Sequence, residues 1–200
     1  MIRKAVYSFF SHPFRTRPGY AGFVTLEHFL NAWTLSVQLA RRHFDAVELV
    51  TDHYGKALLV DALNLPFTSV RDELDAAVPE HIRDLFWTFG KLVAYHLQDE
   101  PFIHIDYDVF LWKRPPERIL HAPLFGQNTE SDIWKIDIYK QGYMAMCAYL
   151  KYRPRDWVVI YPGVHRYDTA INTGIIGGND VHFIREYAST ALKNDGMSRK

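Results

Sequence analysis

Two aspartates, Asp106 and Asp108, are the residues whose types and spacing most clearly allow chemistry. They lie in the stretch PFIHIDYDVFLWKRPP (101–116), where an apolar run is followed by a Lys-Arg-Pro-Pro segment. Side chains alternate between the faces of a strand, so the two carboxylates are predicted to point the same way, roughly 6–7 Å apart, with Tyr107 on the other face. Like charges so close raise one pKa unless a cation lies between them. Because oxygen ligands select hard cations, the pair predicts a site for Mn²⁺ or Mg²⁺.

The chemistry that such a metal site supports is the release of a diphosphate. A divalent ion held by two carboxylates binds phosphate oxygens and neutralises the charge that grows on the leaving group. A nucleotide-diphosphate sugar is a substrate of this type, and a metal-dependent phosphohydrolase is an alternative that usually needs further ligands or a nucleophile. A simpler interpretation is that a buried strand ends and a polar loop begins. The apolar run before the pair and the apolar segment VFLW after it favour the metal site.

Length and composition indicate one globular domain over residues 1–200, with 48% hydrophobic and 23% charged residues. Lys+Arg and Asp+Glu are both 23, so the chain lacks the basic excess of a typical nucleic-acid binder. Its single cysteine excludes an internal disulfide framework and fits a reducing, cytoplasmic location. The apolar runs are too short for a secretory signal or a transmembrane helix, so neither is expected.

The elements that must position the aspartates alternate between strand-like and helical patterns. This order predicts an α/β fold with a mostly parallel central sheet flanked by helices, in which ligands bind beyond the carboxyl ends of the strands. Strands are predicted at 4–10, 46–51, 67–70, 101–106, 123–128 and 157–162. Helices are predicted at 26–43, 55–63, from Pro79 through Val93, and at 182–193, while 131–150 fits either element.

Three segments resemble a known class of enzyme. FIHIDYDVFLWKRP resembles the Asp-x-Asp region of nucleotide-sugar glycosyltransferases with the GT-A fold, and small bacterial glycosyltransferase-like proteins come closest. LFWTFGKLVAYHLQDE looks like the helix that precedes this motif, and INTGIIGGND is similar to the segment that approaches the donor sugar or the acceptor; together they cover about residues 86–180. The resemblance implies a GT-A-like fold. It also implies a metal-dependent glycosyltransferase of the hexosyltransferase type, which moves a sugar from a nucleotide-diphosphate donor to an acceptor hydroxyl.

The resemblance also implies roles for particular residues. Asp108 is the firmer metal ligand, and Asp106 binds the metal or the ribose. The loop after the first strand helps to hold the base, and a residue that ends the second strand lies near the nucleotide pocket. These further donor-binding residues are Ser8, Phe9 and Phe10 for the base and Asp52 for the nucleotide pocket.

Four other residues are candidates for the site, each with a simpler alternative. Lys91 can contact the donor phosphates, but it lies off the apolar stripe of its helix and is also readily interpreted as a solvated lysine. Asn172 and the backbone of Gly174 can approach the sugar, or can belong to a strand with a tight turn. Asp180 is a weak candidate for the base that deprotonates the acceptor, and its position before the last helix favours a role as the N-cap of that helix.

Some features depart from the pattern of the glycosyltransferases. The third metal ligand is not assigned, because no histidine pair has metal-type spacing and the histidines, His104 among them, are interpreted as surface or core residues. The chain ends soon after the INTGIIGGND segment, so the acceptor region is expected to be short or truncated. A non-catalytic module that binds sugar nucleotides or glycans is therefore a second hypothesis.

Overall fold

A six-stranded sheet forms the centre of the fold in the computed structural model, which describes residues 1–16, 19–80, 83, 88–131 and 169–194. The strands are β1 (Lys4–Phe9), β2 (Ala46–Thr51), β3 (Ser69–Asp72), β4 (Phe102–Ile105), β5 (Phe125–Ser131) and β6 (Thr169–Gly178). Their order is β3-β2-β1-β4-β6-β5. β1 pairs in parallel with β2 and β4, β2 pairs in parallel with β3, and β6 runs antiparallel to β4 and β5. The predicted α/β fold with a mostly parallel sheet flanked by helices is confirmed.

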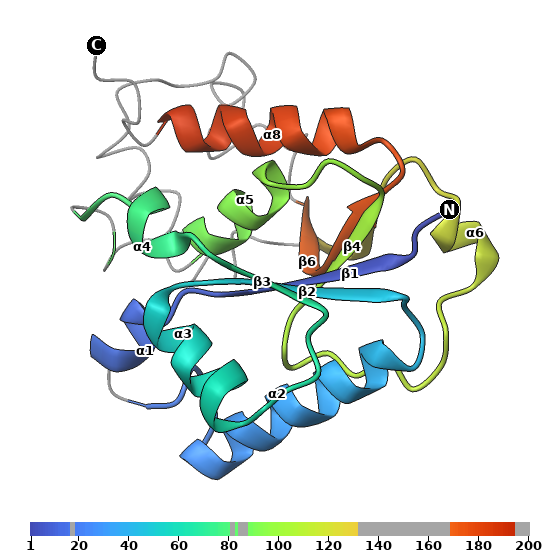
Figure 1. Cartoon of the computed structure of the whole chain (residues 1–200). Helices are drawn as coiled ribbons and strands as arrows, with labels where there is room; N and C mark the ends of the chain where they lie inside the picture. Colours follow the sequence, from blue (N-terminus) through green and yellow to red (C-terminus); the bar gives the residue numbers. More distant parts are fainter. Residues whose placement is uncertain (17–18, 81–82, 84–87, 132–168, 195–200) are drawn as a thin grey trace.

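Helices cover both faces of this sheet (Figure 1). α2 and α3 lie on one face, and α5 and α8 lie on the other. The described helices are α1 (His12–Thr16), α2 (Leu26–Arg41), α3 (His53–Lys56), the π-helix η1 (Ala57–Ala62), α4 (Leu74–Ala77), α5 (Phe89–His96), α6 (Glu117–Leu120) and α8 (Val181–Asn194). Within the described residues, none of the helices has the length and apolar character needed to span a bilayer.

Two apolar layers hold the helices to the sheet. On one face, α2 buries Phe29, Trp33 and Val37 against β1 and β2. On the other face, α5 and α8 bury a second cluster, which includes Phe89 and Ile184. Each large apolar side chain that is fully removed from water stabilises the fold by about 1.5–3 kcal/mol. Because both faces are covered, β1, β2 and β4 are buried along nearly their whole length, as is usual for parallel strands.

Several predicted elements are confirmed with small shifts at their ends. The helix predicted at 26–43 is α2, and Thr25 is its N-cap, with its side chain accepting a hydrogen bond from the amide of His28 at 3.1 Å. The strand predicted at 101–106 ends at Ile105. The chain turns there, because the carbonyl of Asp106 accepts a hydrogen bond from the amide of Val109 at 2.9 Å.

Other predicted elements differ from the structure. The helix predicted at 55–63 begins at His53 and continues as a π-helix, and the short helix α4 was not predicted. Of the helix predicted from Pro79 through Val93, the structure describes α5, which begins at Phe89, while residues 81–82 and 84–87 lie outside the described residues. The strand predicted at 123–128 is shifted to β5, and the glycine-rich segment 171–180 supplies most of β6. The strand predicted at 157–162 and most of the ambiguous segment 131–150 lie outside the described residues.

Candidate functional site

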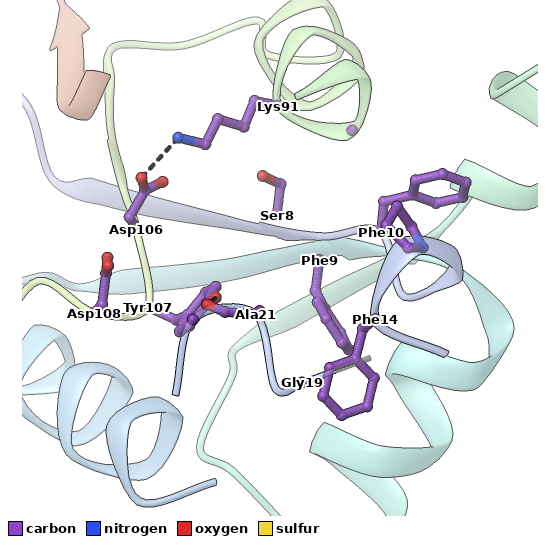
Figure 2. A pocket seen from close by; sticks show the side chains of 13 residues that line it. Ser8, Phe9, Phe10, Phe14, Gly19, Ala21, Lys91, Asp106, Tyr107 and Asp108 are labelled. Atoms are coloured by element: carbon purple, nitrogen blue, oxygen red, sulfur yellow. Dashed lines mark hydrogen bonds and ion pairs between the residues drawn. The ribbon is translucent and has the colours of Figure 1, made fainter. Parts of the chain in front are cut away.

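A cavity of about 390 Å³ lies at the carboxyl ends of β1 and β4. Figure 2 shows that its two ends differ in chemistry. Asp106 and Asp108 point the same way at one end, while Phe9, Phe10 and Phe14 form an aromatic wall at the other. This position at the ends of parallel strands is where open α/β sheets bind their ligands.

Asp106 is held in place by contacts from three directions. Its backbone amide donates to the carbonyl of Gly174 in β6 at 2.8 Å. Its Oδ2 lies 2.7 Å from Nζ of Lys91 in α5, and its Oδ1 lies 3.8 Å from Nδ1 of His104 in β4. Burial raises the pKa of Asp106 above its usual value, the Lys91 ammonium opposes this shift, and the Asp108 carboxylate adds to it. The carboxylate is therefore desolvated, and the Lys91 ammonium stabilises its charged form.

Lys91 is a partly buried residue of the cavity wall. Its side chain is only 12% exposed, so the interpretation of Lys91 as a solvated helix lysine is wrong. The side chain extends from α5 across the cavity to Asp106 (Figure 2). A lysine in this position places a positive charge where a bound phosphate can also reach it.

The turn that carries Asp108 is anchored by the residue between the two aspartates. Tyr107 stacks on Trp33 of α2 with ring centroids 4.9 Å apart and an interplanar angle of 16°. Its hydroxyl donates to the carbonyl of Ala21 at 3.4 Å. Burial, together with the charges of Asp108 and Asp106, raises the pKa of Tyr107. Asp108 itself is exposed, so the turn presents this carboxylate to solvent at the edge of the cavity.

Ser8 lines the cavity from β1, and its hydroxyl is oriented by a hydrogen bond with His104 of the neighbouring strand β4. Its Oγ lies 2.9 Å from Nε2 of His104, whose side chain is 1% exposed. Burial, and to a lesser extent the charge of Lys91, lower the pKa of His104 well below its usual value, so the ring is neutral. The pair fixes the position of the Ser8 hydroxyl beside Lys91 and Asp106.

Glycines let the remaining walls approach the cavity closely. Gly19 and Gly22 line it with φ of 91° and 93°, in the left-handed region that glycine adopts without strain. Gly90 of α5 also lines it, and a Cβ on this residue would meet Cβ of Phe10 at 3.0 Å. A side chain at Gly90 would therefore crowd the wall where α5 crosses the end of β1.

Asp52 does not line the cavity but holds the loop that does. It is 1% exposed and caps α3, with Oδ1 accepting from the amide of Gly55 at 2.8 Å. Its Oδ2 accepts from both the amide and the hydroxyl of Ser11, each at 2.7 Å. Ser11 directly follows Phe10, so Asp52 acts on the cavity indirectly, through the backbone of this loop.

We expect replacement of Asp52 with alanine to lower the free energy of unfolding by roughly 2–4 kcal/mol, because it removes a helix cap and leaves a buried amide of Ser11 without its acceptor. Denaturant unfolding measures the loss. The exposed Asp45, whose side chain is 75% exposed, is a matched control, and Asp45→Ala should change stability by less than about 0.5 kcal/mol. An Asp52→Ala variant of native stability that no longer binds nucleotide would instead assign Asp52 a direct contact with the ligand.

Asn172 and Gly174 lie beside Asp106 but outside the lining of the cavity, whereas Asp180 follows the end of β6 that pairs with the start of β4, away from Asp106. Asn172 donates to Glu130 in β5 at 2.7 Å and accepts from the amide of Gly174 at 2.8 Å. Gly174 supports Asp106 through its carbonyl. Asp180 is exposed and accepts from the amide of Phe183 at 3.0 Å, which caps the start of α8. The structure thus brings Ser8, Phe9, Lys91 and the two aspartates together at the cavity and leaves Asn172 and Asp52 behind its walls. Asp180 lies at the opposite end of β4 from Asp106, so the structure does not bring this candidate base to the cavity.

Comparison with protein families identifies the family of the chain. The model of a family described as "Family of unknown function (DUF6734)" matches residues 3–194. The chain belongs to this family. Comparison of the DUF6734 chain with curated proteins finds no match. Among solved structures, it is similar to mouse xyloside xylosyltransferase 1 in its apo form, with 12% sequence identity and a TM-score of 0.47, covering 96% of this chain and 72% of that chain.

The two aspartates of this DUF6734 chain fit a divalent cation that arrives with a phosphate ligand. Their oxygens are the hard ligands that Mg²⁺ and Mn²⁺ prefer. Within the described residues, no group of three His, Cys, Asp or Glu side chains is arranged to hold a metal. A cation held by the two aspartates would therefore need substrate phosphates and water to complete its coordination, as Mg²⁺ commonly does.

Several residues of the site were not found from the sequence. Phe14 and Gly19 belong to the segment SHPFRTRPGY (11–20), which contains two prolines and a glycine and follows the first strand, and Gly22 comes two residues after it. The position of this segment could have indicated that its residues line the site, because the carboxyl ends of two adjacent parallel strands share one edge of the sheet. His104 was assigned to the surface or the core, and its contact with Ser8 joins residues 96 positions apart, which no local pattern reveals.

Proposed function

We propose that the chain binds a nucleotide-diphosphate sugar in this cavity and transfers the sugar, a hexosyl group, to an acceptor hydroxyl. The observation that supports the proposal is the division of the cavity into an aromatic end and an end with two carboxylates and a lysine. A flat base suits the first end, and a diphosphate suits the second. A volume of about 390 Å³ falls within the usual range for small-molecule sites.

Each part of the site contributes a defined interaction in this proposal. Phe9, Phe10 and Phe14 contact the base and exclude water from it, and Ser8 offers a hydroxyl between the base and the phosphates. The Lys91 ammonium binds a phosphate oxygen. Asp106 and Asp108 would hold Mn²⁺ or Mg²⁺, which when bound supplies charge neutralisation for the departing diphosphate.

A thermal-shift screen with UDP-, GDP-, ADP- and CMP-sugars, with and without Mn²⁺, tests the proposal. A ligand present at about 100 times its Kd stabilises the native state by about 2.7 kcal/mol, which corresponds to a rise in Tm of about 5–10 °C for a chain of this size. We expect one nucleotide class to give such a rise, and to give it only with Mn²⁺.

Incubation of that donor with candidate acceptors then separates the functions. Release of the nucleoside diphosphate with formation of a glycan product supports transfer. Metal-dependent binding without turnover on any acceptor would indicate a binding module, and release of inorganic phosphate from simple phosphoesters would indicate a phosphohydrolase. No shift with any nucleotide would contradict the proposal.

A further inference from the structure

The contact between Lys91 and Asp106 places a positive charge of the chain itself at the proposed metal site. Nζ of Lys91 lies 2.7 Å from Oδ2 of Asp106, and the two side chains are 12% and 21% exposed. Charge-assisted contacts of this length and burial are among the stronger polar interactions in proteins. The ammonium points at the side of Asp106 that lines the cavity (Figure 2).

Among the described residues, Lys91 is the one whose ammonium contacts the Asp106 carboxylate. His104 faces Oδ1 from 3.8 Å, which is longer than a hydrogen bond, and its side chain is 1% exposed. The carbonyl of Gly174 accepts from the backbone amide of Asp106 and does not reach its charge. Asp108 adds a second negative charge at the same end of the cavity. Among the described residues that contact the Asp106 carboxylate, Lys91 therefore supplies the neutralising charge.

A divalent cation between the two aspartates would share the Asp106 carboxylate with Lys91. An ammonium and a metal ion on one carboxylate repel each other at short range, so the metal binds only at the cost of the ion pair. A diphosphate changes this balance, because its oxygens offer Lys91 a new anionic partner. Lys91 can then turn from Asp106 to the phosphate, and Asp106 becomes available to the metal.

We propose that Lys91 competes with the metal for Asp106 until a diphosphate binds, so that metal and diphosphate bind with positive cooperativity. The inference has two halves. The metal half, that Lys91 competes with the metal for Asp106, rests on the contacts of Lys91 alone. The diphosphate half, that a diphosphate releases Lys91 from Asp106, rests on the proposed function. Because coupling between two ligands is reciprocal, the nucleotide raises the metal affinity by the same factor as the metal raises the nucleotide affinity. Such couplings are typically about 5–150-fold.

Electron paramagnetic resonance of free Mn²⁺ measures the metal half without any nucleotide. We expect Lys91→Met to bind Mn²⁺ at least about fivefold more tightly than the native chain, at the lower end of typical couplings. Lys91→Arg keeps the charge and should keep the weak native affinity. Lys56→Met is the matched control for loss of one charge, because Lys56 pairs with Asp72 at 4.0 Å and does not line the cavity. It should leave Mn²⁺ affinity unchanged.

Two further variants test whether misfolding, or Mn²⁺ binding away from the aspartates, explains the result for Lys91→Met. Lys91→Gln removes the charge but keeps an amide that can donate to Asp106, so it tests the inference if the methionine variant folds poorly. Asp108→Asn in the Lys91→Met background should abolish the gain in affinity. If neither uncharged variant of Lys91 binds Mn²⁺ more tightly than the native chain, the inference is wrong.

Titrations of Mn²⁺ with UDP and with GDP measure the diphosphate half. We expect the nucleotide to raise the Mn²⁺ affinity of the native chain by a larger factor than that of Lys91→Met, since only the native chain has a lysine to release. An equal or larger factor in the variant would overturn this half. If Lys91→Met gains Mn²⁺ affinity but no nucleotide binds to either protein, the competition stands and the proposed function fails. If nucleotide and Mn²⁺ bind to the native chain but Lys91→Met binds Mn²⁺ no more tightly, the proposed competition is wrong and the proposed function stands.

Discussion

Asp108→Ala is expected to lower metal-dependent sugar transfer at least about 100-fold, because the metal supplies several kcal/mol of charge stabilisation to the departing diphosphate. The fold should be unaffected, since Asp108 is exposed in the turn after β4. The measurement is donor turnover with the nucleotide sugar identified by thermal shift, at saturating Mn²⁺. Formation of product at the native rate in Asp108→Ala would refute a mechanism that depends on this carboxylate.

An exposed acid away from the cavity serves as the control for this result. Glu117 of α6 has a side chain that is 67% exposed and contacts His121, which directly follows this helix, at 3.4 Å. Glu117→Ala removes the same charge and should leave both turnover and Mn²⁺ affinity unchanged. A parallel loss in this variant would show that net charge, and not the position of Asp108, sets the rate.

Trp33→Ala is expected to cause a large loss of stability, about 3–5 kcal/mol, because it leaves a cavity beneath the turn that carries the aspartates. Trp33 is fully buried, stacks on Tyr107, and packs edge-on against Phe9 with ring centroids 5.5 Å apart. Chemical denaturation followed by circular dichroism measures the change in the free energy of unfolding. A loss below about 1 kcal/mol would show that Trp33 does not support the turn.

Trp33→Phe separates ring packing from hydrogen bonding at this position. The indole nitrogen of Trp33 has no hydrogen-bond partner among the described residues, so phenylalanine loses ring area but no polar contact. We expect it to lose clearly less stability than Trp33→Ala and to keep the native Mn²⁺ affinity. If both variants lose the same stability, the ring of residue 33 does not anchor Tyr107.

The elements that position the site were predictable where a single pattern determines them. The spacing of Phe29, Trp33 and Val37 predicts the buried face of α2, and the structure confirms it. Strand alternation also predicts that Tyr107 and the aspartates lie on opposite sides. Tyr107 packs against the core beside α2 but also lines the cavity together with both carboxylates, because β4 already ends at Ile105 and the chain turns there.

The contacts that determine the electrostatics of the site were not predictable in the same way. The amphipathic pattern of α5 places Lys91 off the apolar stripe, but it cannot tell that a flexible side chain reaches Asp106. Asp52 was predicted beside the nucleotide because it ends a strand, and it instead caps α3 and binds Ser11. Both contacts join segments that are far apart in the sequence, so they depend on how α5 and the loop after β1 pack against the sheet.

The central claim is that Asp106 and Asp108 bind a divalent cation together with the diphosphate of a nucleotide. Anomalous diffraction from crystals grown with Mn²⁺ and the nucleotide identified by thermal shift tests it most directly. We predict one manganese peak at coordination distance, about 2.1 Å, from oxygens of both aspartates, with Lys91 turned to a phosphate oxygen. A nucleotide bound elsewhere, or bound in the cavity with no manganese at these two carboxylates, would contradict the claim.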